Sequence, residues 1–199
     1  IDLAKIGNKV YYIYDKTEQQ YFEESTSMKE YMDAMSQLKE QSFAIYERFE
    51  LPEDAAFIEK LHNANVHILA ITEDWCGDAM INNPIIRKVA EAADVEIRTA
   101  LRDADTDLID RYLTNGGRAI PMYLILNESG EVITTWGPRA PQLQQLVMDM
   151  RATLPEKEDP TFEDAQKELY ENMRKQYVEN SQLWSYVYED FKKKVNTVL

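Results

Sequence analysis

The sequence predicts an α/β fold, a mixed β-sheet covered by helices, with helical extensions at both ends of the chain. Three observations support this prediction. Residues 66–72 form a continuous β-branched and apolar run, which is typical of a strand buried on both faces. The turn-forming residues 127–130 join two short apolar runs as a hairpin would. Segments with apolar residues at helical spacing lie before, between and after these strands.

Length and charge limit the classes of function. The chain has 199 residues, of which 44% are apolar, so it can bury a substantial core. Its formal charge of −14 argues against nucleic-acid and membrane-surface partners, because both need clustered Lys and Arg. No apolar run reaches the roughly 18 to 20 residues that cross a bilayer. Residues 1–15 lack a signal-peptide pattern, so we expect a cytoplasmic location.

We expect three parts along the chain: an N-terminal, largely helical extension at 1–52, a main domain at 53–154 and a C-terminal helical appendage at 155–199. The appendage begins with a charged, proline-bounded linker at 155–160. Two helices with apolar stripes follow, broken near Asn180.

In the N-terminal part, residues 1–24 are Tyr-rich, with weak alternation from Val10 to Tyr14, and predict a short strand or a packed tail. Ser27 followed by Glu30 has the spacing of a capping box. Apolar residues then recur at helical spacing to about Phe49, which predicts one long helix or two with a break.

The main domain alternates between helices and strands. A parallel β-α-β half followed by an antiparallel hairpin predicts the mixed sheet. The predicted elements are a helix at 53–63, a strand at 66–72, a helix at 78–93, a strand at 95–101, a helix at 105–113, strands at 122–126 and 131–136, and a helix at 142–154.

The candidate chemistry is concentrated at residues 75–79, where the first strand of this domain ends and a helix begins. The segment reads Trp75-Cys76-Gly77-Asp78-Ala79. A helix N-terminus stabilises a thiolate, the reactive form of cysteine. Cys76 is the only cysteine, which excludes an internal disulfide and a Cys-rich metal site, and we expect no cofactor. We expect structural roles for the two histidines, His62 and His67.

This segment resembles the Trp-Cys-Gly-Pro-Cys motif of the thioredoxin family. Pro84 matches the proline that kinks the motif helix, and Ile120-Pro121 resembles the cis-proline that faces the active cysteine. Gly130 and Gly137 match the hairpin and closing glycines of the family. The resemblance covers about residues 53–154 and implies a thioredoxin-like fold in which Cys76 is the catalytic residue.

The resemblance also implies a substrate-binding surface around the thiol. Trp75 would be a flat, partly exposed platform or a packing residue, and Pro121, if cis, would expose a backbone edge to an extended substrate. Arg118 and Arg139 lie in segments that line the cysteine in this fold, where each would stabilise a thiolate or hold a carboxylate, or remain a solvated surface residue. The expected substrate-binding residues are Trp75, Gly77, Asp78, Ile120, Pro121, Arg118 and Arg139.

The departures from the family pattern restrict the chemistry. Ala79 stands where thioredoxin has its resolving cysteine, so a mixed disulfide at Cys76 needs an external thiol for release. Ala70 replaces a buried aspartate that moves protons. Asp78 stands in place of the motif proline and, with Glu73 and Asp74, is expected to place negative charge near the sulfur. Sequence alone does not decide whether these carboxylates or the helix terminus dominate.

Three hypotheses remain open. The first is a monothiol thiol-disulfide oxidoreductase whose substrate is a protein or low-molecular-weight thiol or disulfide. The second is a non-catalytic binding module that keeps the fold and uses its helical ends to contact a protein partner. The third is that Ala79 replaces a natural cysteine in an engineered variant, which would restore ordinary dithiol chemistry.

Overall fold

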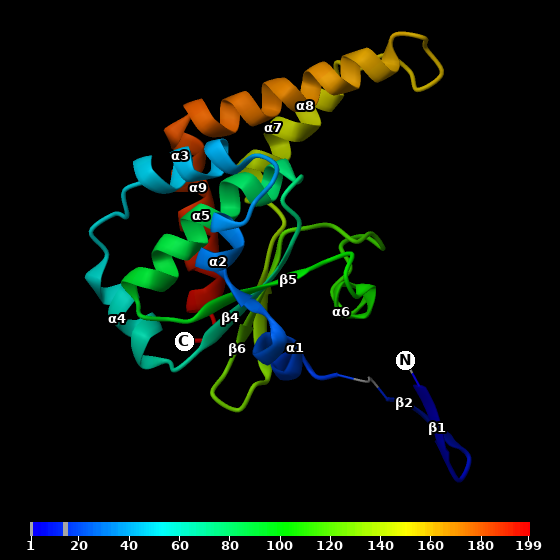
Figure 1. Ribbon diagram of the computed structural model, residues 1–199, viewed down its shortest axis with the longest axis vertical. Coiled ribbons are helices and arrows are strands. Elements are labelled where there is room, and N and C mark those ends of the chain that lie inside the picture. Colours follow the sequence, from blue (N-terminus) through cyan, green and yellow to red (C-terminus); the bar gives the residue numbers. More distant parts are fainter. Residues whose placement is uncertain (1, 14–15) are drawn as a thin grey trace.

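A computed structural model of the chain, shown in Figure 1, describes residues 2–13 and 16–199. A five-stranded mixed sheet with the order β3-β5-β4-β6-β7 forms its centre. The strands are β1 (Asp2–Ile6), β2 (Lys9–Ile13), β3 (Thr26–Ser27), β4 (His67–Thr72), β5 (Ile97–Leu101), β6 (Met122–Leu126) and β7 (Val132–Trp136). The helices are α1 (Glu18–Glu24), α2 (Met28–Asp33), α3 (Lys39–Arg48), α4 (Ala55–Asn63), α5 (Gly77–Ala92), α6 (Thr106–Asp110), α7 (Pro141–Arg151), α8 (Phe162–Glu179) and α9 (Ser181–Asn196).

The central strand β4 is buried on both faces, as its continuous apolar sequence predicted. Successive side chains of a strand point to opposite faces, so its residues divide between two apolar clusters. Ile68 and Ala70 belong to the cluster that includes residues of α2 to α5 and α7 to α9. Leu69 and Ile71 belong to a smaller cluster with residues of α1 and α6. Figure 1 shows α4 and α5 on one side of the sheet and α6 on the other.

Strand pairing determines which loops meet at the end of β4. β4 pairs in parallel with β5 and antiparallel with β6, with Ile71 opposite Met122. The loop after β4 and the segment before β6 therefore lie at the same edge of the sheet. This register brings Cys76 close to Ile120, although they are 44 positions apart in sequence.

The predicted break between two N-terminal helices is present. α2 and α3 are separate, and Leu38, with φ at 55°, has a left-handed conformation just before α3. The predicted break near Asn180 is also confirmed, because the Asn180 side chain accepts a hydrogen bond from the Gln182 amide and caps α9.

The first residues differ from the prediction of one short strand or a packed tail. β1 and β2 form an antiparallel hairpin with its turn at Gly7, where φ is +64°. Tyr14, the last residue of the predicted alternation, lies outside the described residues. β3 joins the main sheet beside β5, so the segment before residue 53 contributes a strand to it. Among the described residues, no helix combines the length and apolarity that crossing a bilayer demands.

Candidate thiol site

Cys76 is the N-cap residue of α5 and is partly buried. Its carbonyl accepts the first hydrogen bond of the helix from the Met80 amide at 3.0 Å. Its Sγ–H donates to the Ile120 carbonyl at 3.6 Å, a contact that follows from the pairing of β4 with β6. The predicted junction of strand and helix is therefore confirmed, and the thiol faces the segment before β6.

The surroundings of Cys76 favour the neutral thiol. Burial is the largest cause, followed by the charge of Asp78, and together they raise the pKa of Cys76 to about 11. The backbone N–H groups of Ala79 and Asp78, followed by the Arg139 guanidinium, lower this pKa but do not offset burial. The competition between helix terminus and carboxylates, which the sequence left open, is thus decided mainly by desolvation.

Asp78 is buried in a cluster of groups from three segments. The Arg139 Nε donates to Asp78 Oδ1 at 3.0 Å, and Arg139 Nη2 lies 2.9 Å from Oδ2, which makes a bidentate ion pair. The Tyr177 hydroxyl, from α8, also donates to Oδ1 at 2.8 Å. Arg139 in turn donates from Nη1 to the Gln144 side chain at 2.8 Å. Bidentate pairs of this kind fix orientation as well as charge.

The two carboxylates that precede Trp75 in the sequence, Glu73 and Asp74, have different partners. Asp74 accepts hydrogen bonds from the Ser36 amide and hydroxyl and from the Gln37 amide. Burial opposes their effect, but these hydrogen bonds lower the pKa of Asp74. Glu73 accepts a hydrogen bond from the Asp103 amide at 3.0 Å. Asp78 is therefore the carboxylate of this segment whose charge acts on the sulfur.

The two predicted arginines have different positions. Arg139 contacts the motif through Asp78, as described above. Arg118 forms an ion pair with Asp110 at 2.7 Å on the surface, and its carbonyl accepts a hydrogen bond from Arg102. Among the described residues the contacts of Arg118 are thus with these two side chains and not with the thiol, which agrees with its alternative interpretation as a solvated arginine.

Trp75 is 44% exposed, as a platform for a substrate requires. The Arg102 guanidinium lies 5.0 Å from the centroid of its ring, within the range of a cation–π contact. This contact links the indole to the segment that follows β5.

Glycine is required where two loops of the site approach each other. The Ile120–Pro121 peptide bond is cis, as expected, and the Gly137–Pro138 bond, which the sequence did not indicate, is cis as well. A Cβ at Gly137, whose φ is +131°, would lie 2.3 Å from the Pro121 carbonyl oxygen. This close approach is possible only for glycine, and it places Arg139 next to the motif.

Helix α8, the first of the two helices in the C-terminal appendage, packs against the start of α5. A Cβ added to Gly77 would lie 3.3 Å from Arg174 Cγ and 3.4 Å from Met173 Cε. Tyr177, one turn further along α8, is fully buried against Asp78. The sequence indicated an apolar stripe that includes Met173 and Tyr177, but it contained no signal for the element that this stripe contacts.

Neutral polar groups lie behind the motif, where both Ala70 and Ala79 are buried. Tyr123 donates to the Asn83 side chain at 2.6 Å, and Asn83 donates to the Thr72 hydroxyl at 3.0 Å. No carboxylate takes part in this chain of hydrogen bonds. The proton-transferring aspartate that Ala70 replaces is therefore not supplied by these three residues.

The histidines have structural contacts, as expected. His62 Nδ1 lies 2.8 Å from the Ala93 carbonyl oxygen, and His67 Nε2 lies 2.5 Å from the Gln19 side-chain oxygen. Burial lowers the pKa of His67. Both histidines join neighbouring elements and are separate from the thiol.

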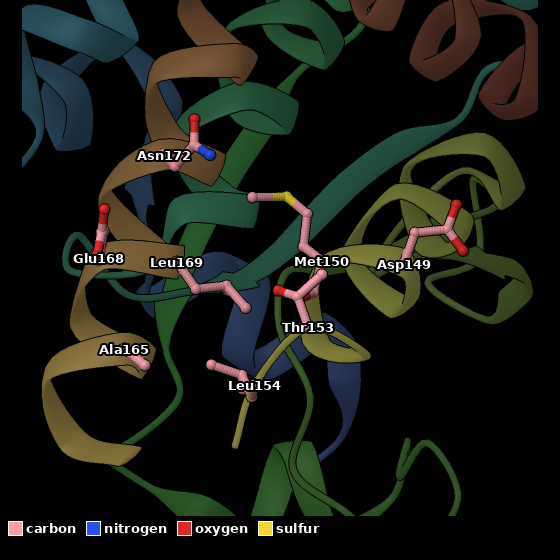
Figure 2. A pocket seen from close by; sticks show the side chains of 8 residues that line it. All are labelled: Asp149, Met150, Thr153, Leu154, Ala165, Glu168, Leu169 and Asn172. Atoms are coloured by element: carbon pink, nitrogen blue, oxygen red, sulfur yellow. The ribbon is translucent and has the colours of Figure 1, made fainter. Parts of the chain in front are cut away.

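A groove of about 500 Å³ lies away from the thiol, between the end of α7 and the first half of α8. Figure 2 shows Leu154 and Leu169 directed toward each other across it. The lining residues are Asp149, Met150, Thr153, Leu154, Ala165, Glu168, Leu169 and Asn172. Cys76, Asp78, Arg139 and Tyr177 do not line this groove, so it is separate from the thiol site.

A mixed sheet with a cysteine at the N-terminus of a helix, facing the segment before an antiparallel strand, defines a thiol protein of the thioredoxin-like class. A family model described as thioredoxin matches residues 25–151. The chain therefore belongs to the thioredoxin family, and the predicted α/β, thioredoxin-like fold is confirmed.

Solved structures agree with this fold. An HIV epitope scaffold is 17% identical, with a TM-score of 0.63, over 92% of this chain and 100% of that chain. A protein of unknown function from Pseudomonas aeruginosa is 14% identical, with a TM-score of 0.57, over 88% of this chain and 99% of that chain. No curated protein matches the sequence.

Proposed function

We propose that this thioredoxin-family chain is a monothiol thiol-disulfide oxidoreductase in which Cys76 is the nucleophile. One observation carries the proposal. The Cys76 sulfur lies at the N-terminus of α5, where the backbone N–H groups of Ala79 and Asp78 lower its pKa, and it contacts the Ile120 carbonyl at 3.6 Å. A helix terminus stabilises negative charge, and this is the charge that develops on the sulfur when the thiol loses its proton.

The reaction is an exchange of thiols. The Cys76 thiol releases its proton to solvent, and the thiolate attacks one sulfur of a substrate disulfide. A sulfur–sulfur bond forms at Cys76, the substrate bond breaks, and one substrate sulfur leaves as a thiolate. Ala79 carries no sulfur, so a second, external thiolate attacks the mixed disulfide. This step regenerates the Cys76 thiolate and forms a new disulfide between the two external groups.

The raised pKa of about 11 makes this exchange slow at neutral pH but does not abolish it. Compared with a thiol of the ordinary pKa of 9.0, the thiolate population at pH 7 is roughly 100-fold smaller. The nucleophilicity of each thiolate is roughly 8-fold greater, because it rises with pKa. The two effects together reduce the rate by about 12-fold, before any change that a bound substrate makes.

The substrate surface in this proposal is formed by groups that surround the sulfur. Trp75 provides the exposed ring, and the Ile120 carbonyl and Gly77 provide backbone beside the thiol. The substrate is a protein or low-molecular-weight disulfide, and the resolving group is a free thiol. A supply of free thiols is typical of a reducing compartment, so we propose the cytoplasm as the location.

The second candidate is a binding module without redox chemistry. The burial of Cys76 and its raised pKa favour it, since both oppose thiolate formation. In this case the surface around Trp75 would bind a protein segment, and Cys76 would be a packing residue. The two candidates differ in whether a covalent bond to Cys76 ever forms.

Incubation with glutathione disulfide at about pH 8 separates the candidates, with intact mass as the measurement. The oxidoreductase predicts one glutathione adduct per chain, none in Cys76→Ser, and loss of the adduct after addition of a reduced thiol. Absence of an adduct in the folded protein, with an adduct in urea, would show that the native site excludes disulfides and would favour the binding module.

A further inference from the structure

The Asp78 carboxylate connects helix α8 to the thiol segment, residues 75–79, which contains Cys76. It lies two positions after Cys76, is 7% exposed, and receives donors from outside its own helix. Tyr177 reaches it from α8 at 2.8 Å, and Arg139 reaches it from the loop before α7 at 2.9 and 3.0 Å. A buried carboxylate needs such partners, because an isolated buried charge is strongly destabilising.

We infer that Tyr177 is a positioning residue of the thiol site: together with Arg139 it holds and compensates the Asp78 carboxylate, so that α8 takes part in controlling Cys76. This inference rests on the proposed function for its biological meaning. The contact itself can be tested through the thiol alone, without any exchange reaction.

Several charged and titratable groups face this part of the molecule. Asp78 raises the pKa of Cys76 and Arg139 lowers it. Tyr31 of α2 and Tyr123 of β6 also interact electrostatically with the Cys76 sulfur. Arg174 of α8 packs its aliphatic stem near Gly77, while the carboxylates of Glu73 and Asp74 are bound to backbone groups elsewhere. Tyr177 thus donates its hydrogen bond to Asp78, the carboxylate whose charge raises the pKa of Cys76.

The direction of the effect follows from competition for the first turn of α5. The N–H groups of Asp78 and Ala79 support a thiolate at Cys76. If Asp78 loses the Tyr177 hydroxyl, its charge is less compensated and acts more strongly on the sulfur and on these N–H groups. Tyr177→Phe should therefore make the thiolate harder to form, whereas Asp78→Asn should make it easier.

A matched control exists in the next helix. Tyr188 of α9 is also fully buried and donates at 2.8 Å to an aspartate, Asp54, which is paired with a cation, Lys192. This second triad has the same chemistry, and within the described part of the chain its hydrogen bond and ion pair do not involve residues 75–79. Like Tyr177→Phe, Tyr188→Phe removes one tyrosine hydroxyl and its hydrogen bond to an aspartate.

The experiment measures the rate of Cys76 alkylation by iodoacetamide against pH, with Cys76→Ser as the blank. We expect the midpoint to rise by roughly half a unit in Tyr177→Phe and to fall by roughly one unit in Asp78→Asn. Tyr188→Phe should leave it unchanged. In the double variant Tyr177→Phe/Asp78→Asn, the midpoint should equal that of Asp78→Asn, because Tyr177 acts through the carboxylate.

Two results would overturn the inference. The first is a Tyr177→Phe midpoint equal to that of Tyr188→Phe, with only the melting temperature lowered, which would make Tyr177 a packing residue. The second is a Tyr177→Phe shift that persists without the Asp78 carboxylate. If the alkylation midpoints shift as expected but no glutathione adduct forms, the positioning role of Tyr177 stands and the oxidoreductase proposal fails.

Discussion

The Tyr177 hydroxyl donates to Asp78 Oδ1 at 2.8 Å, which joins two residues 99 positions apart in the sequence. Tyr177 belongs to helix α8, and Asp78 belongs to the first turn of α5, which begins directly after Cys76. Hydrogen bonds to charged groups are stronger than neutral ones, at roughly 1.5 to 3 kcal/mol. Helix α8 is therefore part of the structure that surrounds the thiol.

The two arginines predicted from the sequence should behave differently. Arg139→Gln removes a cation that lowers the pKa of Cys76, so we expect the alkylation midpoint to rise by roughly one unit. Arg118→Gln removes the same charge from a surface pair with Asp110 and should leave the midpoint unchanged. Alkylation rates against pH measure both. Equal shifts in the two variants would mean that only the net charge of the chain matters.

Replacing Ala79 with cysteine should restore internal resolution. Ala79 is 2% exposed and lies three positions after Cys76, the spacing of the dithiol motif in the family it resembles. In Ala79→Cys we expect a glutathione adduct to disappear without added thiol, with formation of an internal disulfide. Ala90→Cys adds a buried cysteine to the same helix and is the control. Intact mass follows the reaction, and a lasting adduct in Ala79→Cys would show that position 79 cannot reach the sulfur.

The close approach at Gly137 should make it intolerant of a side chain. A Cβ there would lie 2.3 Å from the Pro121 carbonyl oxygen, so we expect Gly137→Ala to destabilise the fold by about 3 kcal/mol or more. Gly116 also has a positive φ, of +78°, but has open space around it. Gly116→Ala should therefore cost only about 1 kcal/mol. Urea unfolding measures both, and similar losses would contradict the close contact.

The raised pKa of Cys76 predicts how stability depends on pH. Its folded-state pKa is about 11, above the ordinary 9.0, so the folded state binds this proton more tightly. The resulting stabilisation is complete below pH ~9 and is lost as the pH rises through ~11. We expect the free-energy difference between wild type and Cys76→Ser to fall by about 2 kcal/mol over this range. A constant difference would mean that the thiol is not perturbed.

The sequence predicted the elements of the main domain well, because its signals were local. The buried run at β4, the hairpin of β6 and β7, and the junction at Cys76 each depend on neighbouring residues. β3 was missed because two residues carry no periodicity, and its pairing with β5 is a long-range contact. For the residues that form β1 and β2 the sequence predicted only a short strand or a packed tail, because their alternation is weak.

The candidate site was predicted in part. Arg139 was selected from its place in a loop, but its partner Asp78 was identified only as a source of negative charge. Tyr177 was seen as part of an apolar stripe, and no local pattern connects it with a residue of α5. Burial of the thiol was missed for the same reason, because desolvation depends on every segment packed around the sulfur.

The measurement that tests the central claim most directly is catalysed exchange between reduced glutathione and a fluorogenic mixed disulfide. The account predicts an initial rate above the uncatalysed reaction that increases linearly with protein concentration, rises with pH and is lost in Cys76→Ser. A rate equal to the uncatalysed one, or an acceleration that survives in Cys76→Ser, would contradict a monothiol oxidoreductase acting through Cys76.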